Sequence, residues 1–333
     1  MVSIAELLIV AFFVLTLLLI IFERIPKTLA AMLGAGLSLL VAITPGSAPD
    51  GGVIISDIEH LLELVEMDLL LVIIGITLMV GVARGTGLFD YIAILIIKKS
   101  GHNQYTLLVA LSLLTLIFSA FLDAFMAIII VASITIVACD ALDISPKPFI
   151  FAEAIFGNLG GTMTRIASPP NLIIGGHFDV SFLDFLMLTA PYVLITSLIT
   201  LIILGFLFRS SLSYKISDFH YNEILLIEEN IVIDNQKDFI MASVIFVVTI
   251  IGFTIAPYLP MEIELGYVAL AGGFTMVGFV GQDVEKSLEK VEWPIVFFLV
   301  GLLTIVGIAE RAHILEVLAI PIDIYLNRIF LVD

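Results

Sequence analysis

The stretch Gly157-Asn158-Leu159-Gly160-Gly161-Thr162-Met163-Thr164-Arg165-Ile166-Ala167-Ser168-Pro169-Pro170-Asn171 lies between two apolar runs, 149–156 and 172–176. So many glycines, prolines and polar side chains cannot continue a helix that faces lipid. Non-helical backbone at membrane depth occurs only where protein covers it or where water fills a cavity. The stretch is therefore either a loop outside a bilayer or a binding site within one.

The rest of the chain has the composition of a membrane protein. Apolar residues make up 61% of it and charged residues 14%, and several uncharged runs have the length of a transmembrane helix. The run 7–22 follows Glu6 and lacks a small-residue cleavage site, so we expect a retained helix. The apolar runs fall at about 4–22, 28–43, 69–83, 105–122, 124–139, 149–156, 172–176, 183–208, 239–256, 266–281 and 294–309. This pattern predicts an all-α polytopic membrane protein.

Composition and motifs exclude several function classes. The only cysteine, Cys139, allows no internal disulfide and no cysteine metal cluster, and we expect it to be a small core residue. A net charge of −17 argues against nucleic acid as a partner. We find no phosphate-binding Gly-Lys loop, zinc motif or nucleophile–base pattern. We therefore expect neither an enzyme nor a resident metal or cofactor.

Two segments interrupt the simple pattern of spans. Asp123 alone separates the runs 105–122 and 124–139, and one helix over 105–139 would be about 50 Å long. We interpret these runs as a re-entrant hairpin with residues 119–123 near its tip. The runs 149–156 and 172–176 are each too short to cross about 30 Å of hydrocarbon, so together they predict one broken helix. The segment 86–100 fits a helix in the interface.

The Lys and Arg residues predict the orientation. One set of loops contains Arg24, Lys27, Arg84, Lys98, Lys99, Lys147, Arg209, Lys215, Lys237, Lys286 and Lys290. The loops 44–66, 177–182 and 257–265 contain neither residue type but carry several acids. The positive-inside rule places the first set in the cytoplasm of a cell membrane protein, with the N-terminus outside. The alternation holds if the hairpin returns to its own side and the broken helix crosses once.

The sequence also contains an internal repeat. Residues 66–94 align without gaps to 292–320, and the matches are Glu66/Glu292, Gly75/Gly301, Val80/Val306, Gly81/Gly307, Ala93/Ala319 and Ile94/Ile320. Weaker similarity links 29–34 with 268–273. The charge pattern predicts that the two copies cross the membrane in opposite directions, as in inverted-repeat secondary transporters. We expect a first repeat at 1–208, a cytoplasmic linker at 209–238 and a truncated second repeat at 239–333.

The broken helix supplies most candidate ion-binding residues. Asn158 lies near the carbonyl end of the first half-helix, and Pro169 and Pro170 suit the first turn of the second, whose positive end attracts anions. Gly160 and Gly161 allow the backbone to approach a ligand closely. The remaining candidates in this stretch are Thr162, Thr164, Ser168 and Asn171.

Three charged residues allow alternative readings. Asp123 at the hairpin tip is a candidate cation or proton site, or a structural partner. Arg165 has a functional role if it binds an anionic substrate or neutralises Asp123 or Glu153, because an unpaired arginine is costly in lipid. The alternative is a structural ion pair near a helix end. Glu153 follows Pro148 closely, so we expect it at the interface rather than in a proton relay. Thr115 and Ser119 either face the cavity or bond to their own helix.

Four segments carry a family resemblance: FERIPKTLAAMLGA (22–35), GLFDYIAI (87–94), SAFLDAFMA (119–127) and NLGGTMTRIASPPNLIIG (158–175). The chain resembles the ion transporter superfamily from about residue 3 to 320, especially the arsenite efflux and sodium–proton antiporter group with citrate-transporter-like domains. The resemblance implies that the hairpin tip and the helix break form one ion site, mirrored in a second repeat. It also implies elevator-type alternating access and a homodimer.

The chain departs from this family's pattern at two positions. Ala124 stands where an Asn is common, and Ser168 stands where an Asp often precedes Pro-Pro-Asn. Both changes remove oxygen ligands for sodium, whereas Arg165 favours an anion. We therefore expect secondary active transport of a small ion of the arsenite or anion efflux type, with sodium or protons as coupling ions and sodium near Asp123 and Asn158. The alternatives are sodium–proton exchange and a truncated membrane protein that transports nothing.

Overall fold

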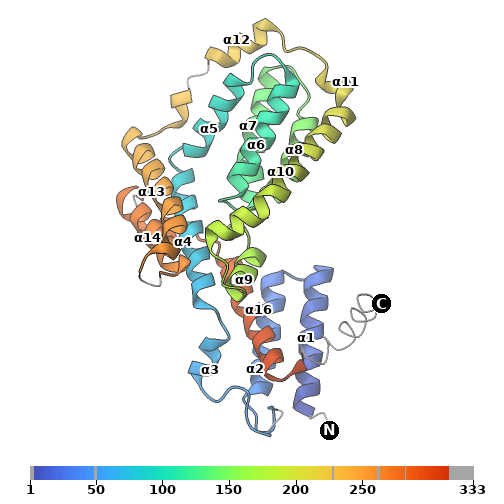
Figure 1. Ribbon diagram of the computed structural model, residues 1–333, viewed down its shortest axis with the longest axis vertical. Coiled ribbons are helices and arrows are strands. Elements are labelled where there is room, and N and C mark those ends of the chain that lie inside the picture. Colours follow the sequence, from blue (N-terminus) through green and yellow to red (C-terminus); the bar gives the residue numbers. More distant parts are fainter. Residues whose placement is uncertain (1–3, 49–50, 227–228, 261–262, 282, 315–333) are drawn as a thin grey trace. The chain divides into compact units, whose positions relative to one another are not determined.

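The computed structural model describes residues 4–48, 51–226, 229–260, 263–281 and 283–314. Within these ranges the chain forms sixteen α-helices and no β-strand, which confirms the all-α fold (Figure 1). The chain divides into two compact units. Unit 1 comprises Met1–Leu70 with Glu292–Asp333, and unit 2 comprises Leu71–Val291.

Among the residues that the structure describes, six helical segments are long and apolar enough to cross a membrane. They are α1 (Ile4–Phe22), α4 (Met67–Arg84), α7 (Ala124–Ala141), α10 (Phe182–Leu207), α13 (Gln236–Ile255) with the short helix η2 (Ala256–Tyr258), and α16 (Trp293–Arg311). Shorter apolar helices are α2 (Lys27–Ala42), α6 (Gln104–Ser119) and α14 (Leu265–Phe279). These helices account for all the predicted apolar runs except 149–156 and 172–176, and the chain is a polytopic membrane protein.

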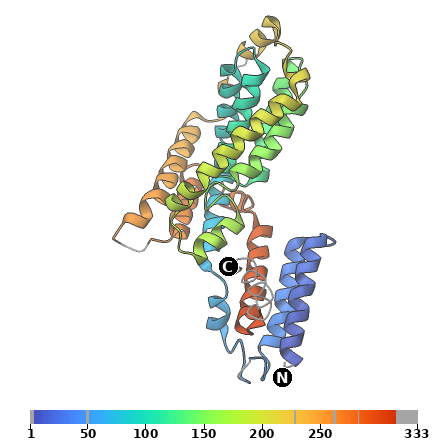
Figure 2. The same ribbon diagram turned by 45° about the vertical axis from the view of Figure 1, so that its right-hand side comes forward.

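Unit 1 is a bundle of α1, α2 and α16, and α1 and α2 lie side by side in Figure 2. A Cβ atom on Gly301 of α16 would lie 2.6 Å from the carbonyl carbon of Ala31 in α2. A Cβ atom on Gly34 would overlap the side chain of Thr16 in α1. Glycine at these two positions therefore permits the close approach of the three helices.

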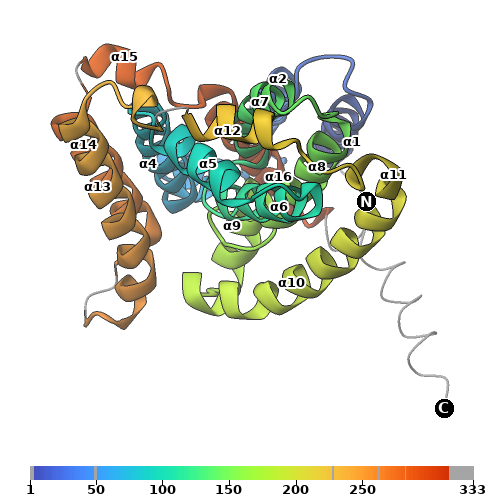
Figure 3. The same ribbon diagram turned by 90° about the horizontal axis from the view of Figure 1, so that it is seen from above.

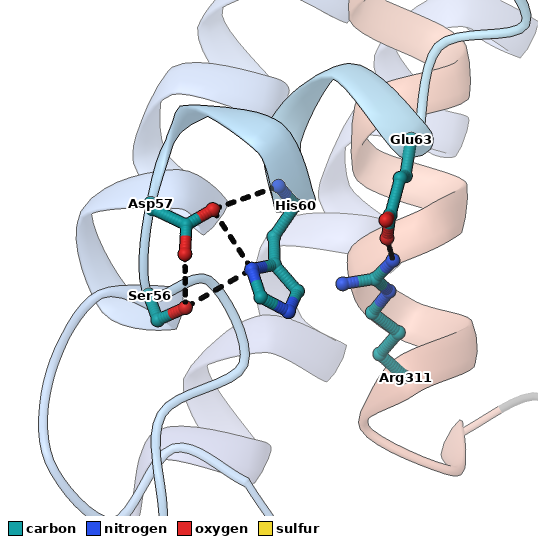
Figure 4. Close-up of polar contacts among 5 residues, drawn as sticks. All are labelled: Ser56, Asp57, His60, Glu63 and Arg311. Atoms are coloured by element: carbon teal, nitrogen blue, oxygen red, sulfur yellow. Dashed lines mark hydrogen bonds and ion pairs between the residues drawn. The ribbon is translucent and has the colours of Figure 1, made fainter.

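A short helix, α3 (Ile58–Glu63), follows α2 in unit 1, and the sequence did not predict it. Asp57 caps it, and the hydrogen bond from the backbone N–H of His60 is the main cause that lowers the Asp57 pKa to about 2 (Figure 4). Glu63 at its end forms a 2.6 Å ion pair with Arg311 at the end of α16. This pair joins two segments that the predicted topology places on the same side of the membrane.

Unit 2 contains a second packing of the same kind, formed by α13, α14 and residues 71–84 of α4. Figure 3 shows α13 beside α14. A Cβ atom on Gly75 of α4 would overlap the backbone of Ala269 in α14. A Cβ atom on Gly272 of α14 would overlap the side chain of Thr249 in α13.

The two packings have the same kinds of contact at corresponding positions. Gly75 meets the carbonyl of Ala269 and Gly301 meets that of Ala31, while the hydroxyls of Thr249 and Thr16 both bond to the carbonyl four residues earlier in their own helices. These contacts make Ala31 equivalent to Ala269. The sequence alignment of 29–34 with 268–273 pairs Ala31 with Leu270 instead, so it differs by one residue. In both packings the first helix pair of one predicted repeat, α1 with α2 or α13 with α14, meets a helix of the other repeat, α16 or α4.

The remainder of unit 2 is a bundle that carries the hairpin and the broken helix. It contains α5 (Leu88–Lys99), α6, α7, α8 (Lys147–Gly160) and α10, and α9 (Pro169–His177) follows α8. Asn103, Asp123 and Ser181 cap α6, α7 and α10 through side-chain oxygens that accept backbone N–H groups. The buried face of α5 consists of Leu88, Phe89, Ala93 and Ile97, so α5 is packed on one side.

The predicted linker has more structure than a hydrated loop. It contains α11 (Arg209–Leu212), α12 (Asp218–Leu226) and η1 (Glu229–Val232), and α15 (Val284–Leu288) precedes α16. The Tyr221 hydroxyl donates to the carbonyl of Lys98 at 2.6 Å, and the Gln104 amide donates to the carbonyl of Tyr214 at 2.9 Å. The linker is therefore bound to the turn between α5 and α6, which the charge pattern assigns to the same side.

Candidate functional site

The hairpin tip is a four-residue turn between two packed helices. α6 ends at Ser119 and α7 begins at Ala124. Asp123 closes the turn because its Oδ1 accepts the backbone N–H of Phe125 at 2.8 Å. Its side chain is half-buried. One carboxylate oxygen is thus committed to capping α7, and the other has no hydrogen-bond partner among the described residues.

The helix break spans the eight residues 161–168, from the end of α8 at Gly160 to the start of α9 at Pro169. The two prolines occupy the first turn of α9, as the sequence predicts. Asn171 holds the break in shape, because its Nδ2 donates to the carbonyls of Gly161 at 3.0 Å and Thr164 at 2.8 Å. The side-chain N–H groups of Asn171 therefore satisfy backbone carbonyls that the break leaves without helical partners.

The tip and the break are in direct contact. The buried Thr164 hydroxyl donates to the carbonyl of Ala120 in the tip. In the opposite direction, the Ser119 hydroxyl donates to the carbonyl of Gly157, one turn before the end of α8. The first hydrogen bond thus joins the break to the tip, and the second joins the end of α6 to the last turn of α8 beside them. The structure brings the two interruptions together into one polar cluster, which we call the tip–break cluster.

The two candidate glycines have different surroundings. A Cβ atom on Gly160 would overlap the carbonyl oxygen of Leu116 and lie 2.9 Å from the Cβ of Ser119. The close approach that Gly160 permits is thus between α8 and α6. A Cβ atom on Gly161 would meet nothing closer than 3.4 Å. Of the two glycines, Gly161 is therefore the one whose surroundings leave room for an added methyl group.

Three further candidates lie at or next to the break with their side chains exposed or half-buried, and we call these positions its rim. Asn158 and Thr162 are exposed, and each donates to a carbonyl of its own segment, Ala154 and Leu159, both at 2.8 Å. Ser168 precedes α9 and is half-buried, and its hydroxyl makes no capping hydrogen bond. Because Pro169 and Pro170 have no N–H, Asn171 is the first residue of α9 that can donate a backbone hydrogen bond. The rim offers an amide, two hydroxyls and one helix N-terminus.

Arg165 lies behind the rim, buried against α9. Its guanidinium Nη1 donates to the carbonyl of Val180 at 2.9 Å. Its side chain crosses α9 at Gly175, where a Cβ atom would lie 2.7 Å from the Arg165 Cδ. Gly175 lies in the last turn of α9 and Val180 lies beyond it, so the positive charge is at the C-terminal end of α9. This is the end of a helix that attracts cations.

Glu153 is completely buried within the bundle. Its Oε1 accepts the hydroxyl of Thr135 in α7 at 2.6 Å. The sequence predicts an interfacial position for Glu153, and its depth in a membrane stays a prediction. Its burial depends on which face of α8 it occupies, which proximity to Pro148 does not indicate. Cys139 is buried as predicted.

Two open alternatives are decided by the hydrogen bonds. Thr115 donates to Leu111 in its own helix, whereas Ser119 reaches across to α8. The sequence reasoning did not find the roles of Ala120 and Gly157, because each acts through its carbonyl oxygen, which every residue has. It also missed Thr189 of α10, whose hydroxyl lies 2.7 Å from the carbonyl of Met163. Among the described residues, no three His, Cys, Asp or Glu side chains lie close enough to hold a metal ion.

The fold and the tip–break cluster define a polytopic membrane protein in which a helical hairpin and a broken helix meet. Residues 17–331 match the family described as Citrate transporter, so the chain belongs to that family. The arsenite and antiporter branch that the sequence resembles is narrower than this family, and the match to the family does not distinguish it.

The chain is also similar to several curated proteins. An uncharacterized transporter of Mycobacterium tuberculosis is 30% identical over 257 residues, which cover 77% of this chain and 58% of the relative. The 46 kDa membrane protein of Mycobacterium leprae is 27% identical over 308 residues, covering 92% of this chain and 69% of the relative. The P protein of Homo sapiens is 33% identical over 174 residues, covering 52% of this chain and 20% of the relative. The chain thus spans between a fifth and about two thirds of these relatives' lengths.

Proposed function

We propose that this chain moves a small anion across the cell membrane by secondary active transport of the arsenite or anion efflux type. The observation that carries the proposal is the pair of hydrogen bonds that joins the hairpin to α8 and to the helix break. Irregular backbone within a membrane bundle is stable where protein covers it and where it lines a binding site. In the tip–break cluster, each interruption covers part of the other.

Charge around the cluster favours an anion. The N-terminus of α9 is the positive end of a helix and lies at the break, whereas the Arg165 guanidinium lies at the opposite end of the same helix. The helix N-terminus is therefore the positive group closest to the proposed substrate, and Arg165 adds a positive charge farther away. The exposed side chains of Asn158 and Thr162 add groups that bind oxyanions or carboxylates. The family description makes citrate a second anion to test beside arsenite. In this proposal Asn158, Gly161, Thr162, Ser168 and Asn171 surround the substrate, Asp123 receives the coupling ion beside them, and Gly160, Thr164 and Arg165 support the site.

Asp123 favours a second candidate function, sodium–proton exchange. It is a half-buried carboxylate with one oxygen uncommitted, at the tip of a hairpin. Such a group binds either a sodium ion or a proton, and the amide oxygen of Asn158 is a further ligand of the kind that sodium binds. In the anion proposal the same carboxylate receives the coupling ion. In the proposed function the chain forms a homodimer, and its N-terminus lies outside the cell.

Flux into proteoliposomes tests these functions. The purified chain is reconstituted, and uptake of labelled arsenite and labelled citrate is measured with and without pH and sodium gradients. Anion transport predicts saturable uptake that Asn158→Ala reduces and that Asp140→Asn, an exposed acid at the end of α7, leaves unchanged. Sodium-dependent loss of a pH gradient, unaffected by either anion, would favour exchange. No flux under any gradient would favour a chain that transports nothing by itself.

A further inference from the structure

Glu153 is a buried acid that the tip–break cluster does not use. Its relative exposure is 0%, and its Oε2 atom is buried with no hydrogen-bond partner among the described residues. The only bond to its carboxyl group is the 2.6 Å hydrogen bond from Thr135 to Oε1. Within the described residues it forms no ion pair.

The surroundings supply no compensating positive charge. The helices packed against α8 are α6, α7 and α10. Their titratable side chains are Tyr105 on α6, Cys139 and Asp140 on α7, and Asp184 and Tyr192 on α10; among these only Cys139 is buried. Asp123 caps the far end of α7, twelve residues or about 18 Å from Thr135 along the helix axis. None of these groups is a cation, and Lys147, the cation of α8 itself, is exposed at the first residue of that helix.

Two magnitudes decide the protonation state. An ionised carboxylate buried without a cation costs several kcal/mol even after relaxation. A neutral carboxylic acid with one unpaired O–H costs about 1–3 kcal/mol. The acid form is therefore the one that fits this position, with its proton on Oε2.

The location of Glu153 connects this proton to the hairpin. Phe149, Glu153, Phe156, Gly157 and Gly160 follow the spacing of one helical face, and all five are buried. Gly157 and Gly160 on this face touch α7 and α6 respectively. Any displacement of the hairpin from α8 thus uncovers Glu153 as well as the tip–break cluster.

We infer that Glu153 is a proton-binding site buried between the hairpin and α8, protonated when the two are packed and deprotonated when they separate. On separation the Oε2–H bond breaks, the carboxylate keeps the electron pair, and the proton passes to water. On closure the carboxylate takes a proton from water. The link to transport rests on the proposed function, whereas the protonated state of the packed bundle does not.

Infrared spectroscopy of the purified full chain tests the protonated state. The wild type is expected to show the C=O stretch of a buried neutral carboxyl at neutral pH, and this band should disappear reversibly at alkaline pH. Glu153→Gln, which replaces the acid by an isosteric amide, should lack the band, and Asp140→Asn should keep it. Absence of the band in the wild type, or its persistence in Glu153→Gln, would overturn the inference.

Flux separates the coupling role from the proposed function. In proteoliposomes, Glu153→Gln is expected to lose the response of anion uptake to an imposed pH gradient, while uptake without the gradient persists. An unchanged response in this variant would overturn the coupling role. If the wild type shows no flux, the proposed function fails, and the infrared result still decides whether Glu153 binds a proton.

Discussion

Single hydroxyl groups hold the tip–break cluster together, and their effects can be separated from those of ordinary threonines. Thr164 and Thr115 are both completely buried, but Thr164 donates to the hairpin tip and Thr115 donates within its own helix. Removing the first hydroxyl leaves the Ala120 carbonyl without that donor. The second removal changes only a local bond that competes with the helix backbone.

Thr164→Val should therefore destabilise the protein by about 1–3 kcal/mol, the cost of an unsatisfied buried polar group. Thr115→Val keeps the same shape and should change stability by less than about 1 kcal/mol. Thermal unfolding of both variants in detergent measures the difference. Equal effects would show that the contact between Thr164 and Ala120 contributes nothing particular.

Gly160 and Gly161 form a second matched pair. Gly160→Ala places a methyl group against the Leu116 carbonyl and Ser119, so α8 must move away from α6. We expect a loss of about 1–3 kcal/mol from overpacking, together with a loss of transport. Gly161→Ala meets only ordinary contacts and should stay folded. Equal stability of the two variants by thermal unfolding would contradict the assigned packing.

At the scale of elements, the sequence predicts the existence of helices well and the contacts between them poorly. The Gly-Pro stretch predicts the break between α8 and α9 because prolines start helices and cannot continue them. Asp123 marks the hairpin turn because it is the only charge in a long apolar run. The burial of Glu153, however, depends on which face of α8 meets the hairpin, and apolar residues surround that helix on most sides. The carbonyl partners Ala120 and Gly157 leave no signal in side-chain chemistry.

The internal repeat shows the same limit. The alignment of 66–94 with 292–320 rests on Gly75 and Gly301, and the structure gives both glycines the same role against α14 and α2. Residues Ala319 and Ile320 of that alignment lie outside the described residues. The weaker match of 29–34 was one residue out of register because small residues are frequent in both helices. The opposite orientation of the two copies in a membrane stays a prediction.

If the two packings are equivalent, alanine should act alike in both. Gly75→Ala and Gly301→Ala should each destabilise the protein, because each added methyl group meets the backbone of a neighbouring helix. Gly36→Ala and Gly278→Ala are controls within α2 and α14, since nothing lies within 4 Å of either added methyl group. Thermal unfolding compares all four. A large effect at only one of the first pair would argue against equivalence.

At the scale of the whole molecule, contacts within each unit agree with the grouping of loops by charge. Glu63 pairs with Arg311, Tyr221 bonds to the turn at Lys98, and Gly81 lies against Lys290. Each contact joins segments that the predicted topology places on one side. Arg311 is a basic residue on the predicted outer side, and its ion pair with Glu63 explains how it is accommodated there.

The predicted orientation can be tested by thiol labelling in intact cells. Cys139 is buried, so a single added cysteine gives the signal. His60→Cys, in the acidic loop, should react with a membrane-impermeant maleimide added outside. Ser217→Cys, in the linker, should react only after the cells are opened. The reverse pattern would place the N-terminus in the cytoplasm.

The central claim is that the tip–break cluster binds the transported ion, and thermal unfolding with and without that ion tests it most directly. A ligand that binds only the folded protein at one hundred times its dissociation constant adds about 2.7 kcal/mol of stability. We predict that arsenite, citrate or sodium raises the unfolding temperature of the wild type and of Asp140→Asn, but not that of Asp123→Asn or Asn158→Ala. The account would be contradicted if none of the three ions stabilised the wild type, or if the two cluster variants responded as the wild type does.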